Sequence, residues 1–269
     1  MIRFAGKGAA AFAMFLAVAG PVPAVAQSGD LVERGRYLVT AGGCTSCHTD
    51  TKAKGKPFAG GAGIETEFGT FYPPNITSDP VHGIGAWSDT TFHNAMRLGV
   101  GPRGGHFYPS FPYTSYTNIV DEDLKAMRAY LATVPPVAKP SKPHEIGFPF
   151  NIRLLQAGWK ILFFRKGPFE ADPGRSAAAN RGAYLVEALA HCGECHTARN
   201  ALGGLDYDRW MAGTANGPEG EKIPNITPDP DTGLTWSEAE IVDYLKIGMT
   251  PGGDFAGSLM ADVVSHNTG

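Results

Sequence analysis

Two short stretches of the chain carry the same side chains, in an order that could hold a redox cofactor. They are Cys44-Thr45-Ser46-Cys47-His48 and Cys192-Gly193-Glu194-Cys195-His196. Two thiols three residues apart can each form a thioether to one edge of the same porphyrin, and the adjoining histidine then lies under the ring as an iron ligand. Each stretch therefore predicts one covalently attached haem c, with His48 and His196 as the two iron-binding histidines.

A redox-active or zinc-binding Cys-x-x-Cys pair is the alternative interpretation. A redox motif does not need the adjoining histidine twice, and a zinc site would take four protein ligands. All four cysteines of the 269-residue chain lie in the two motifs, so none is left for a structural disulfide. Stability must then come from packing and from the attached haems.

An electron-transferring haem needs a second strong ligand opposite the histidine, and a methionine sulfur there raises the reduction potential. The second half of the chain offers Met249 and Met260. Met260 lies where a chain that returns over the haem would place it, whereas Met249 directly follows an expected helix. Met260 is therefore the predicted iron ligand, and a core position is the alternative for either methionine.

The corresponding loop of the first half, residues 105–113, contains no methionine. Met96 and Met127 fall within expected helices and are interpreted as core residues. His106 is the best local candidate for the second iron ligand of the first haem. The alternative is a five-coordinate iron, open to small ligands under an apolar pocket that Phe111 caps.

Residues 1–26 have the pattern of a secretory signal peptide. Arg3 and Lys7 form a positive start, residues 8–20 are apolar but too short to span a bilayer, and Ala24-Val25-Ala26 is a small-x-small cleavage site. Export to the periplasm suits the chemistry, because c-type haem is attached outside the bacterial cytoplasm. No other segment is long enough to be transmembrane.

Several landmarks recur in the same order at nearly constant spacing, which indicates a duplicated domain. The matching segments are residues 34–39 with 181–186, 74–77 with 224–227, and 87–88 with 236–237. The predicted organisation after the signal peptide is a first domain at residues 27–136, a linker at residues 137–175 and a second domain at residues 176–269.

Each copy is expected to begin with a helix that runs into the cysteine motif, at residues 29–41 and 177–190. A second helix should begin at an N-capping serine, Ser88 or Ser237.

In the first copy a last helix is expected at residues 121–132, with Asp121 as its N-cap and a close crossing over the first helix at Gly35. The second copy has no such helix in this sequence. The apolar face of residues 177–190 is therefore expected to lack its packing partner, and the chain is interpreted as a fragment with an incomplete second domain.

The linker contains an aromatic and basic segment, residues 154–166, that favours a short amphipathic helix. One interpretation is a clasp packed between the two haem domains, and the other is a membrane-surface or partner-docking element with Trp159 at the interface. Residues 176–269 carry 13 acidic and 5 basic side chains. This charge either steers a basic redox partner or forms a solvated acidic surface.

These motifs resemble those of bacterial dihaem class I cytochromes c. The chain is similar to the cytochrome subunits of periplasmic alcohol and gluconate dehydrogenases, which typically carry three haem motifs. The resemblance rests on the repeated Arg-Gly-x-Tyr-Leu-Val lead, both Cys-x-x-Cys-His motifs, the Pro-Asn-Ile-Thr loops and the Gly-x-x-Met-Ala segment. Such subunits usually have Pro-Ala-Met-Pro-Tyr in the first distal loop, where this chain has Phe111 in place of the methionine.

The expected fold is all-α, with two tandem class I cytochrome c domains joined by an irregular linker and a second domain without its last helix. The expected function is transfer of single electrons in the periplasm between a dehydrogenase and a downstream cytochrome or oxidase, a placement that rests on the resemblance. The alternative is a haem enzyme that acts on a small molecule at an open first haem. Association with a membrane surface is a further possibility, and no nucleic-acid partner is expected.

Overall fold

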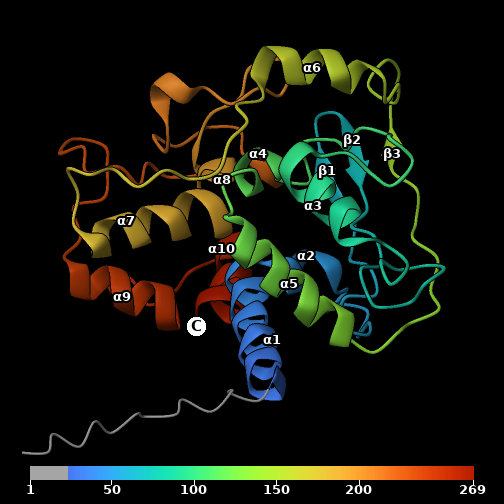
Figure 1. The fold of residues 1–269 in the computed structure, drawn as a ribbon. Helices are drawn as coiled ribbons and strands as arrows, with labels where there is room; N and C mark the ends of the chain where they lie inside the picture. Colours follow the sequence, from blue (N-terminus) through green and yellow to red (C-terminus); the bar gives the residue numbers. More distant parts are fainter. Residues whose placement is uncertain (1–23) are drawn as a thin grey trace, which may run out of the picture.

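The computed structural model of the protein describes residues 24–269, with side chains from residue 29 onward. The signal peptide expected at residues 1–26 lies outside the described residues, except for its last three positions. The described chain is mostly helical (Figure 1). Its α-helices are α1 (Ala24–Ala41), α2 (Cys44–His48), α3 (Asp89–Leu98), α4 (Tyr113–Tyr116), α5 (Asp121–Thr133), α6 (Leu155–Phe163), α7 (Ala177–Tyr184), α8 (Gly193–His196), α9 (Glu238–Ile247) and α10 (Ser258–Val263).

Short strands and tight helical turns complete the architecture. The strands are β1 (Ile64–Thr66), β2 (Gly69–Phe71) and β3 (Glu145–Ile146). Turns of π-helix cover Leu185–Leu189 and Val264–Thr268, and turns of 3-10 helix cover Tyr207–Arg209 and Pro218–Gly220. None of the helices between residues 24 and 269 has both the length and the apolar character that a membrane span requires.

Helices α1 and α5 cross in close contact (Figure 1). A Cβ atom at Gly35 would lie 1.9 Å from the carbonyl oxygen of Ala126, so the two backbones approach as closely as they do only because position 35 has no side chain. Beside the crossing, the Arg34 guanidinium donates to Asp123 Oδ1 over 2.7 Å. The close approach predicted at Gly35 is confirmed.

Serine side chains begin the second helix of each copy, as predicted. Ser88 Oγ accepts from the backbone N–H of Thr91 at the start of α3. Ser237 begins α9 with a reciprocal capping box, in which its hydroxyl accepts from the Glu240 N–H and the Glu240 carboxylate accepts from the Ser237 N–H.

The N-cap of α5 differs from the prediction. Val120 holds the cap position, and Asp121 is the first helical residue. The carboxylate of Asp121 instead accepts from Arg97 over 2.5 Å and lies 3.2 Å from the His93 ring. Asp121 therefore ties α5 to α3, because an ion pair with a buried guanidinium competes for the same oxygens that would cap the helix.

A small antiparallel sheet corrects the expectation of an all-α fold. Its strand order is β1-β2-β3, with Ile64 opposite Phe71 and Gly69 opposite Ile146. Gly69 adopts φ +122°, and a Cβ atom there would lie 2.3 Å from the carbonyl oxygen of Glu145. Because β3 belongs to the predicted linker, the sheet fastens the linker to the first copy.

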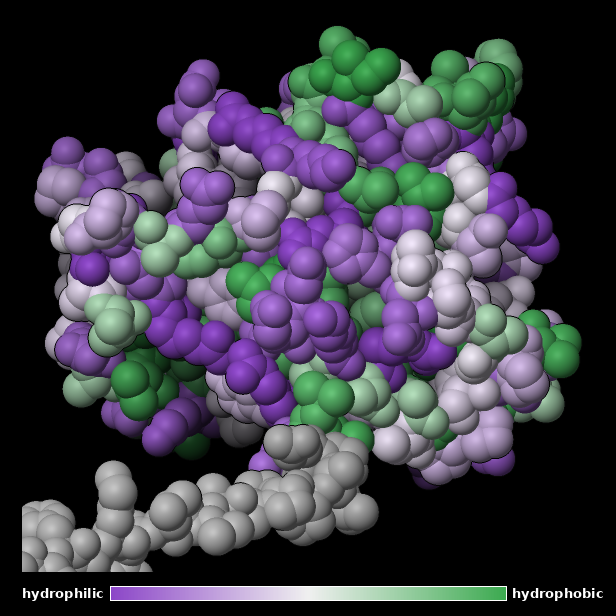
Figure 2. Space-filling model, viewed as in Figure 1, coloured by the Kyte–Doolittle hydropathy of each residue, from purple (hydrophilic) through white to green (hydrophobic). Residues whose placement is uncertain are grey.

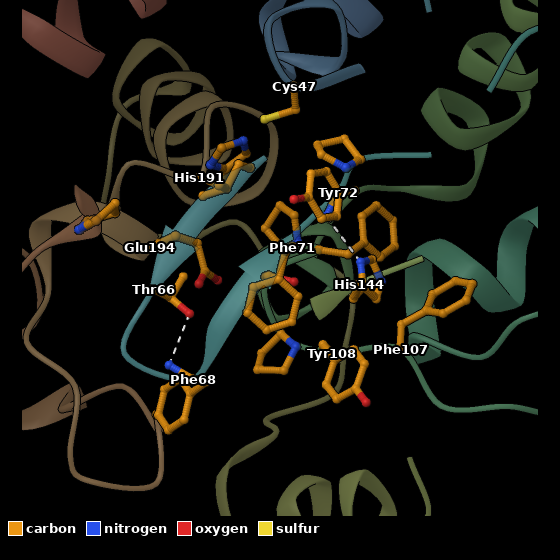
Figure 3. A pocket seen from close by; sticks show the side chains of 18 of the residues that line it. Cys47, Thr66, Phe68, Phe71, Tyr72, Phe107, Tyr108, His144, His191 and Glu194 are labelled. Carbon is orange, nitrogen blue, oxygen red and sulfur yellow. Dashed lines mark hydrogen bonds between the residues drawn. The ribbon is translucent and has the colours of Figure 1, made fainter. Parts of the chain in front are cut away.

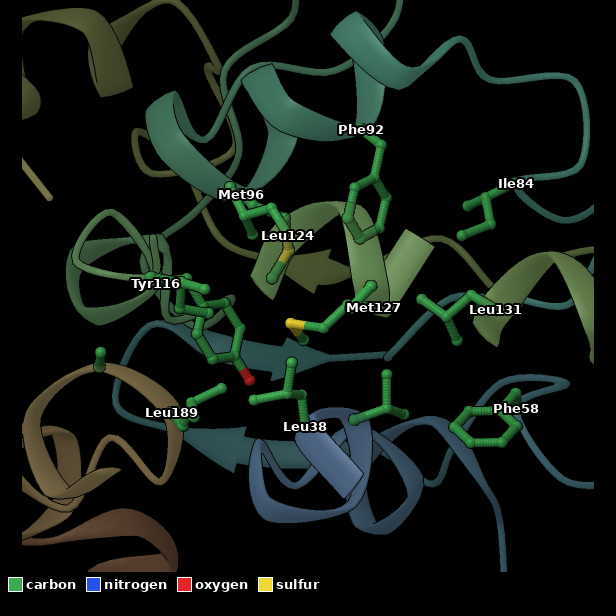
Figure 4. Packing of buried hydrophobic residues seen from close by; sticks show 14 of the residues in the cluster. Leu38, Phe58, Ile84, Phe92, Met96, Tyr116, Leu124, Met127, Leu131 and Leu189 are labelled. Carbon is green, nitrogen blue, oxygen red and sulfur yellow. The ribbon is translucent and has the colours of Figure 1, made fainter. Parts of the chain in front are cut away.

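Residues from both copies share one hydrophobic core (Figure 4). Leu38 of α1 and Met127 of α5 lie in the same buried cluster as Tyr184 and Leu189 of the second copy. The Tyr184 hydroxyl also donates to Asp123 Oδ2 over 2.7 Å. The expectation that the apolar face of residues 177–190 lacks a packing partner is therefore wrong, because the first copy covers it.

Helix α6 contacts both copies. The indole N–H of Trp159 donates to the carbonyl of Leu202 over 2.8 Å. The ammonium of Lys160 donates to the carbonyls of Leu98 and Gly99, over 2.6 and 2.8 Å, where α3 ends. Leu98 is the last residue of α3, so the lysine satisfies a backbone acceptor that the helix end leaves open, whereas the Gly99 carbonyl also accepts from the Phe107 N–H.

Candidate functional site

The first cysteine motif forms helix α2, entered through a left-handed residue. Gly43 has φ +67°, a conformation that a side chain disfavours. The four thiols are free of disulfides, as thioether formation requires. Burial raises the pKa of Cys44 to about 12 and those of Cys192 and Cys195 to about 11. The cysteines needed for covalent attachment are thus present as unpaired thiols.

Both motif histidines are oriented by the same kind of contact. Nδ1 of His48 lies 2.7 Å from the carbonyl oxygen of Pro74, and Nδ1 of His196 lies 2.8 Å from that of Pro224. A carbonyl can only accept, so Nδ1 carries the hydrogen and Nε2 keeps its lone pair. This is the arrangement by which proteins orient a metal-binding imidazole and raise its basicity.

Repeated asparagines hold the proline carbonyls in place. Asn75 Oδ1 accepts from the backbone N–H and the hydroxyl of Thr77, and its amide donates to two linker carbonyls, those of Val137 and Lys139. Asn225 Oδ1 accepts from the same two groups of Thr227. Sequence reasoning used Pro-Asn-Ile-Thr as a repeat landmark and missed its role in orienting the two histidines.

A cavity of about 2500 Å³ opens beside the first motif and extends to Cys195 of the second. Cys44, Cys47 and His48 line it together with large apolar side chains, which Figure 3 shows in part. The apolar wall includes Trp87, Phe92, Met96, Phe111, Tyr116 and Met127. Two free thiols, an oriented imidazole and an apolar cavity are the features that a covalently attached porphyrin needs, so the residues present fit haem c.

The structure does not bring His106 to this cavity. Its Nδ1 lies 3.1 Å from the Lys160 ammonium, on the side of α6, and it is not among the residues that line the cavity wall. Burial and the charge of Lys160 both lower the pKa of His106. Its position therefore argues against the predicted role as second iron ligand, because its ring is engaged by the linker helix.

The cavity wall includes His144, which sequence reasoning did not consider. His144 Nδ1 accepts the backbone N–H of Tyr72 over 3.1 Å, and the ring packs edge to face against Tyr108 (Figure 3). With Nδ1 accepting, the neutral ring carries its hydrogen on Nε2. His144 thus presents a donor and is unsuited to bind iron in this tautomer.

The predicted ligands of the second copy lie on separate elements. His196 ends α8, and burial lowers its pKa while the Pro224 carbonyl raises it. Met260 lies half-buried in α10. Met249 follows α9 and is more than one third exposed. Met260 remains the prediction for the second iron ligand.

Sequence reasoning also missed a buried carboxylate inside the second motif. Glu194 pairs with Arg199 over 2.5 Å and accepts hydrogen bonds from Thr114 and Ser115 of the first copy. The only sequence signal was a charged residue at a variable position of Cys-x-x-Cys-His. Arg199 is five positions away, but the two hydroxyl partners lie 80 and 79 positions away and could not be identified from spacing.

Comparisons with known proteins agree with this geometry. Residues 32–135 match the family model of cytochrome c. The chain is 47% identical over 240 residues to a dihaem c-type cytochrome of Cereibacter sphaeroides, with 87% of this chain and 79% of that protein covered. It is 40% identical to the cytochrome subunit of fructose dehydrogenase from Gluconobacter japonicus, covering 92% of this chain and 50% of the subunit.

A third relative is the cytochrome c subunit of gluconate 2-dehydrogenase from Pantoea cypripedii, at 38% identity over 88% of this chain and 55% of the subunit. The chain thus spans about half the length of the two dehydrogenase subunits. The chain belongs to the cytochrome c family, whose members bind haem c covalently. The predicted similarity to dehydrogenase cytochrome subunits is confirmed, and the chain is an electron-transfer cytochrome.

Proposed function

We propose that this protein is a dihaem c-type cytochrome that transfers single electrons in the periplasm. The observation that carries the proposal is the duplication of one complete site. Each copy places two free thiols next to an imidazole whose Nδ1 is bonded to a proline carbonyl. The cytochrome of Cereibacter sphaeroides, which is named as dihaem, supports a count of two.

The haem supplies reversible one-electron chemistry at its iron, and the chain supplies attachment, orientation and shielding. Cys44 and Cys47 would hold the first porphyrin, with His48 as iron ligand. Cys192 and Cys195 would hold the second, with His196 and Met260 as the two iron ligands. The proline carbonyls fix each imidazole, and the apolar side chains that line the cavity at the first motif would shield that haem from water.

The proposed partners are a dehydrogenase as electron donor and a cytochrome or oxidase as acceptor. Relatives named as subunits of fructose and gluconate dehydrogenases support the donor. The acidic residues of the second copy would favour a basic docking partner.

Association with a membrane surface is supported by a patch around α6. Phe148, Leu154, Ile161 and Leu162 are each more than two thirds exposed. Figure 2 shows apolar surface in the same region, at the top of the view. Arg153 lies among these residues in the sequence, and Arg165 and Lys166 follow closely after Leu162. Exposed apolar side chains with basic neighbours suit the interface of an anionic bilayer. We refer to the four apolar residues as the α6 patch.

The second candidate function is a haem enzyme with an open first haem. The observation that favours it is the engagement of His106 by Lys160, on the side of α6. With Phe111 on the cavity wall, the first iron would then face an apolar pocket large enough for a small molecule.

The decisive test of the proposed function is the number of haems in the whole chain. Cys192→Ala together with Cys195→Ala should lower the pyridine haemochrome content per polypeptide by about half, because each motif holds its own porphyrin. Redox titration of the wild type should resolve two one-electron waves. A wild-type protein with a single haem, or a variant with unchanged haem content, would contradict the proposal.

A further inference from the structure

Helix α4 lies between the two cysteine motifs and contacts the segments at both. The Tyr116 hydroxyl donates to the carbonyl of Gly42, two residues before Cys44, over 2.8 Å. The Tyr116 ring packs edge to face on His191, the residue before Cys192, with centroids 5.5 Å apart. A four-residue helix of the first copy thus contacts the residues that precede both cysteine motifs.

Glu194 provides the polar part of this junction. Its Oε1 accepts from the hydroxyls of Thr114 and Ser115 over 2.5 and 2.9 Å, and its Oε2 accepts from Arg199 over 2.5 Å. The Glu194 side chain is only 8% exposed. Figure 3 shows Glu194 and His191 at the cavity, with Cys47 nearby. Both carboxylate oxygens are therefore paired, one to each copy.

A buried carboxylate is retained at little cost only when its oxygens are hydrogen-bonded and its charge is paired. Here the carboxylate sits between the two cysteines of the second motif, so any movement of α8 away from α4 would break both hydroxyl contacts. Thr114 and Ser115 are buried, so both hydroxyls would lose their acceptor if the contact opened. The junction resists separation for this reason.

We propose that Glu194 is a positioning residue for electron exchange between the two haems. It clamps α8, which carries the second attachment motif, onto α4, and α4 in turn contacts the segment before the first motif. This contact would fix the separation of the two porphyrins, on which the rate of electron tunnelling depends exponentially. This inference rests on the proposed dihaem function.

The test removes the hydroxyls and leaves the charge pair in place. Thr114→Val with Ser115→Ala deletes both donors to Glu194 at nearly constant volume. The matched control is Thr133→Val with Ser265→Ala, whose hydroxyls each bond only a carbonyl of their own helical segment. Haem content is measured first in the whole chain, followed by amide hydrogen exchange of α4 and α8 and by the interhaem rate after photochemical reduction.

The variant with Thr114→Val and Ser115→Ala should keep both haems, and the visible absorption spectrum of each haem should be unchanged. Its α4 and α8 amides should exchange about tenfold faster or more, as expected for lost hydrogen bonds to a charged group, and interhaem electron exchange should slow. Glu194→Gln keeps an oxygen that accepts from the hydroxyls but turns an NH2 group toward Arg199, so it should lose the ion pair and retain more of the amide protection of α4 than the double variant does. The inference would be overturned if the double variant had the same amide protection and the same rate of interhaem electron exchange as the control variant. A wild-type chain with one haem would refute the dihaem function instead.

Discussion

Nδ1 of His48 lies 2.7 Å from the carbonyl oxygen of Pro74, and the next residue, Asn75, ties that loop to the carbonyls of Val137 and Lys139. The buried Asn75 side chain takes part in four hydrogen bonds, two of them to the linker. The basicity of the His48 imidazole, the proposed iron ligand, is therefore coupled to how firmly a loop 26 residues away is held.

Asn75→Ala should raise the reduction potential of the first haem. A weaker bond from Nδ1 to the Pro74 carbonyl makes the imidazole less basic, and a less basic ligand stabilises ferric iron less. Folding stability should also fall, by about 0.5–1.5 kcal/mol for each hydrogen bond lost. Spectroelectrochemical titration measures the potential. Asn225→Ala is the matched control, because it should shift the second haem and leave the first unchanged. Equal shifts at both haems in either variant would contradict this account.

Gly35→Ala should destabilise the first copy. The new Cβ atom would lie 1.9 Å from the Ala126 carbonyl oxygen, so α1 and α5 must separate, and such overpacking typically costs about 1–3 kcal/mol. Gly182 occupies the same position in the repeat, and a Cβ atom there meets no described atom within 4 Å. Gly182→Ala should therefore be neutral or stabilise α7 by up to about 1 kcal/mol. Denaturant unfolding followed by circular dichroism compares the two variants. A Gly35→Ala protein as stable as Gly182→Ala would show that the crossing tolerates a methyl group.

The sequence contained enough information for the parts of the site that are local in the chain. The thioether cysteines, the adjoining histidines and the serine caps each depend on residues within a few positions of one another. Gly35 was identified because a residue without a side chain lets two neighbouring helices cross closely. By contrast, the Glu194 contacts with Thr114 and Ser115, and the Lys160 contact with His106, join residues more than 50 positions apart. Their partners are set by how the copies and the linker pack, which no spacing rule encodes.

Stability above neutral pH should depend on Lys160. Burial lowers the pKa of this ammonium from 10.5 to about 8 in the folded protein. Between these two values the unfolded chain binds more protons than the folded chain, so this group makes the free energy of unfolding rise with pH across that window. Lys160→Met should remove the contribution. Urea unfolding at several pH values measures how steeply the free energy of unfolding changes with pH. Lys166→Met, at an exposed position, is the control. A slope that is the same in wild type and Lys160→Met would show that the ammonium is not held in a desolvated site.

The α6 patch should bind vesicles that contain anionic lipid. Ile161→Ser with Leu162→Ser should weaken this binding, because two side chains that are 86% and 69% exposed would no longer enter the bilayer interface. Val242→Ser with Leu245→Ser is the matched control, since both are exposed apolar residues in the acidic second copy. Vesicle flotation at low and high salt separates the apolar contribution to binding from the electrostatic one, because salt screens only the latter. If the α6 variant floats as well as the control, the patch serves something other than a membrane.

Carbon monoxide binding should be the same in wild type and in His106→Ala. The His106 ring faces Lys160 and not the cavity, so its removal exposes no coordination position at the first iron. Phe111, which is on the cavity wall, cannot coordinate iron in its place. The measurement is the ferrous carbonyl spectrum and the binding rate in both proteins. Binding by His106→Ala but not by wild type would restore His106 as the second ligand and would require the loop at residues 105–113 to turn inward.

Rapid and equal binding of carbon monoxide by both proteins would favour the enzyme function. Equal absence of binding would leave the carrier function in place and direct the search for the ligand to Met96 and Met127, whose side chains both lie on the cavity wall.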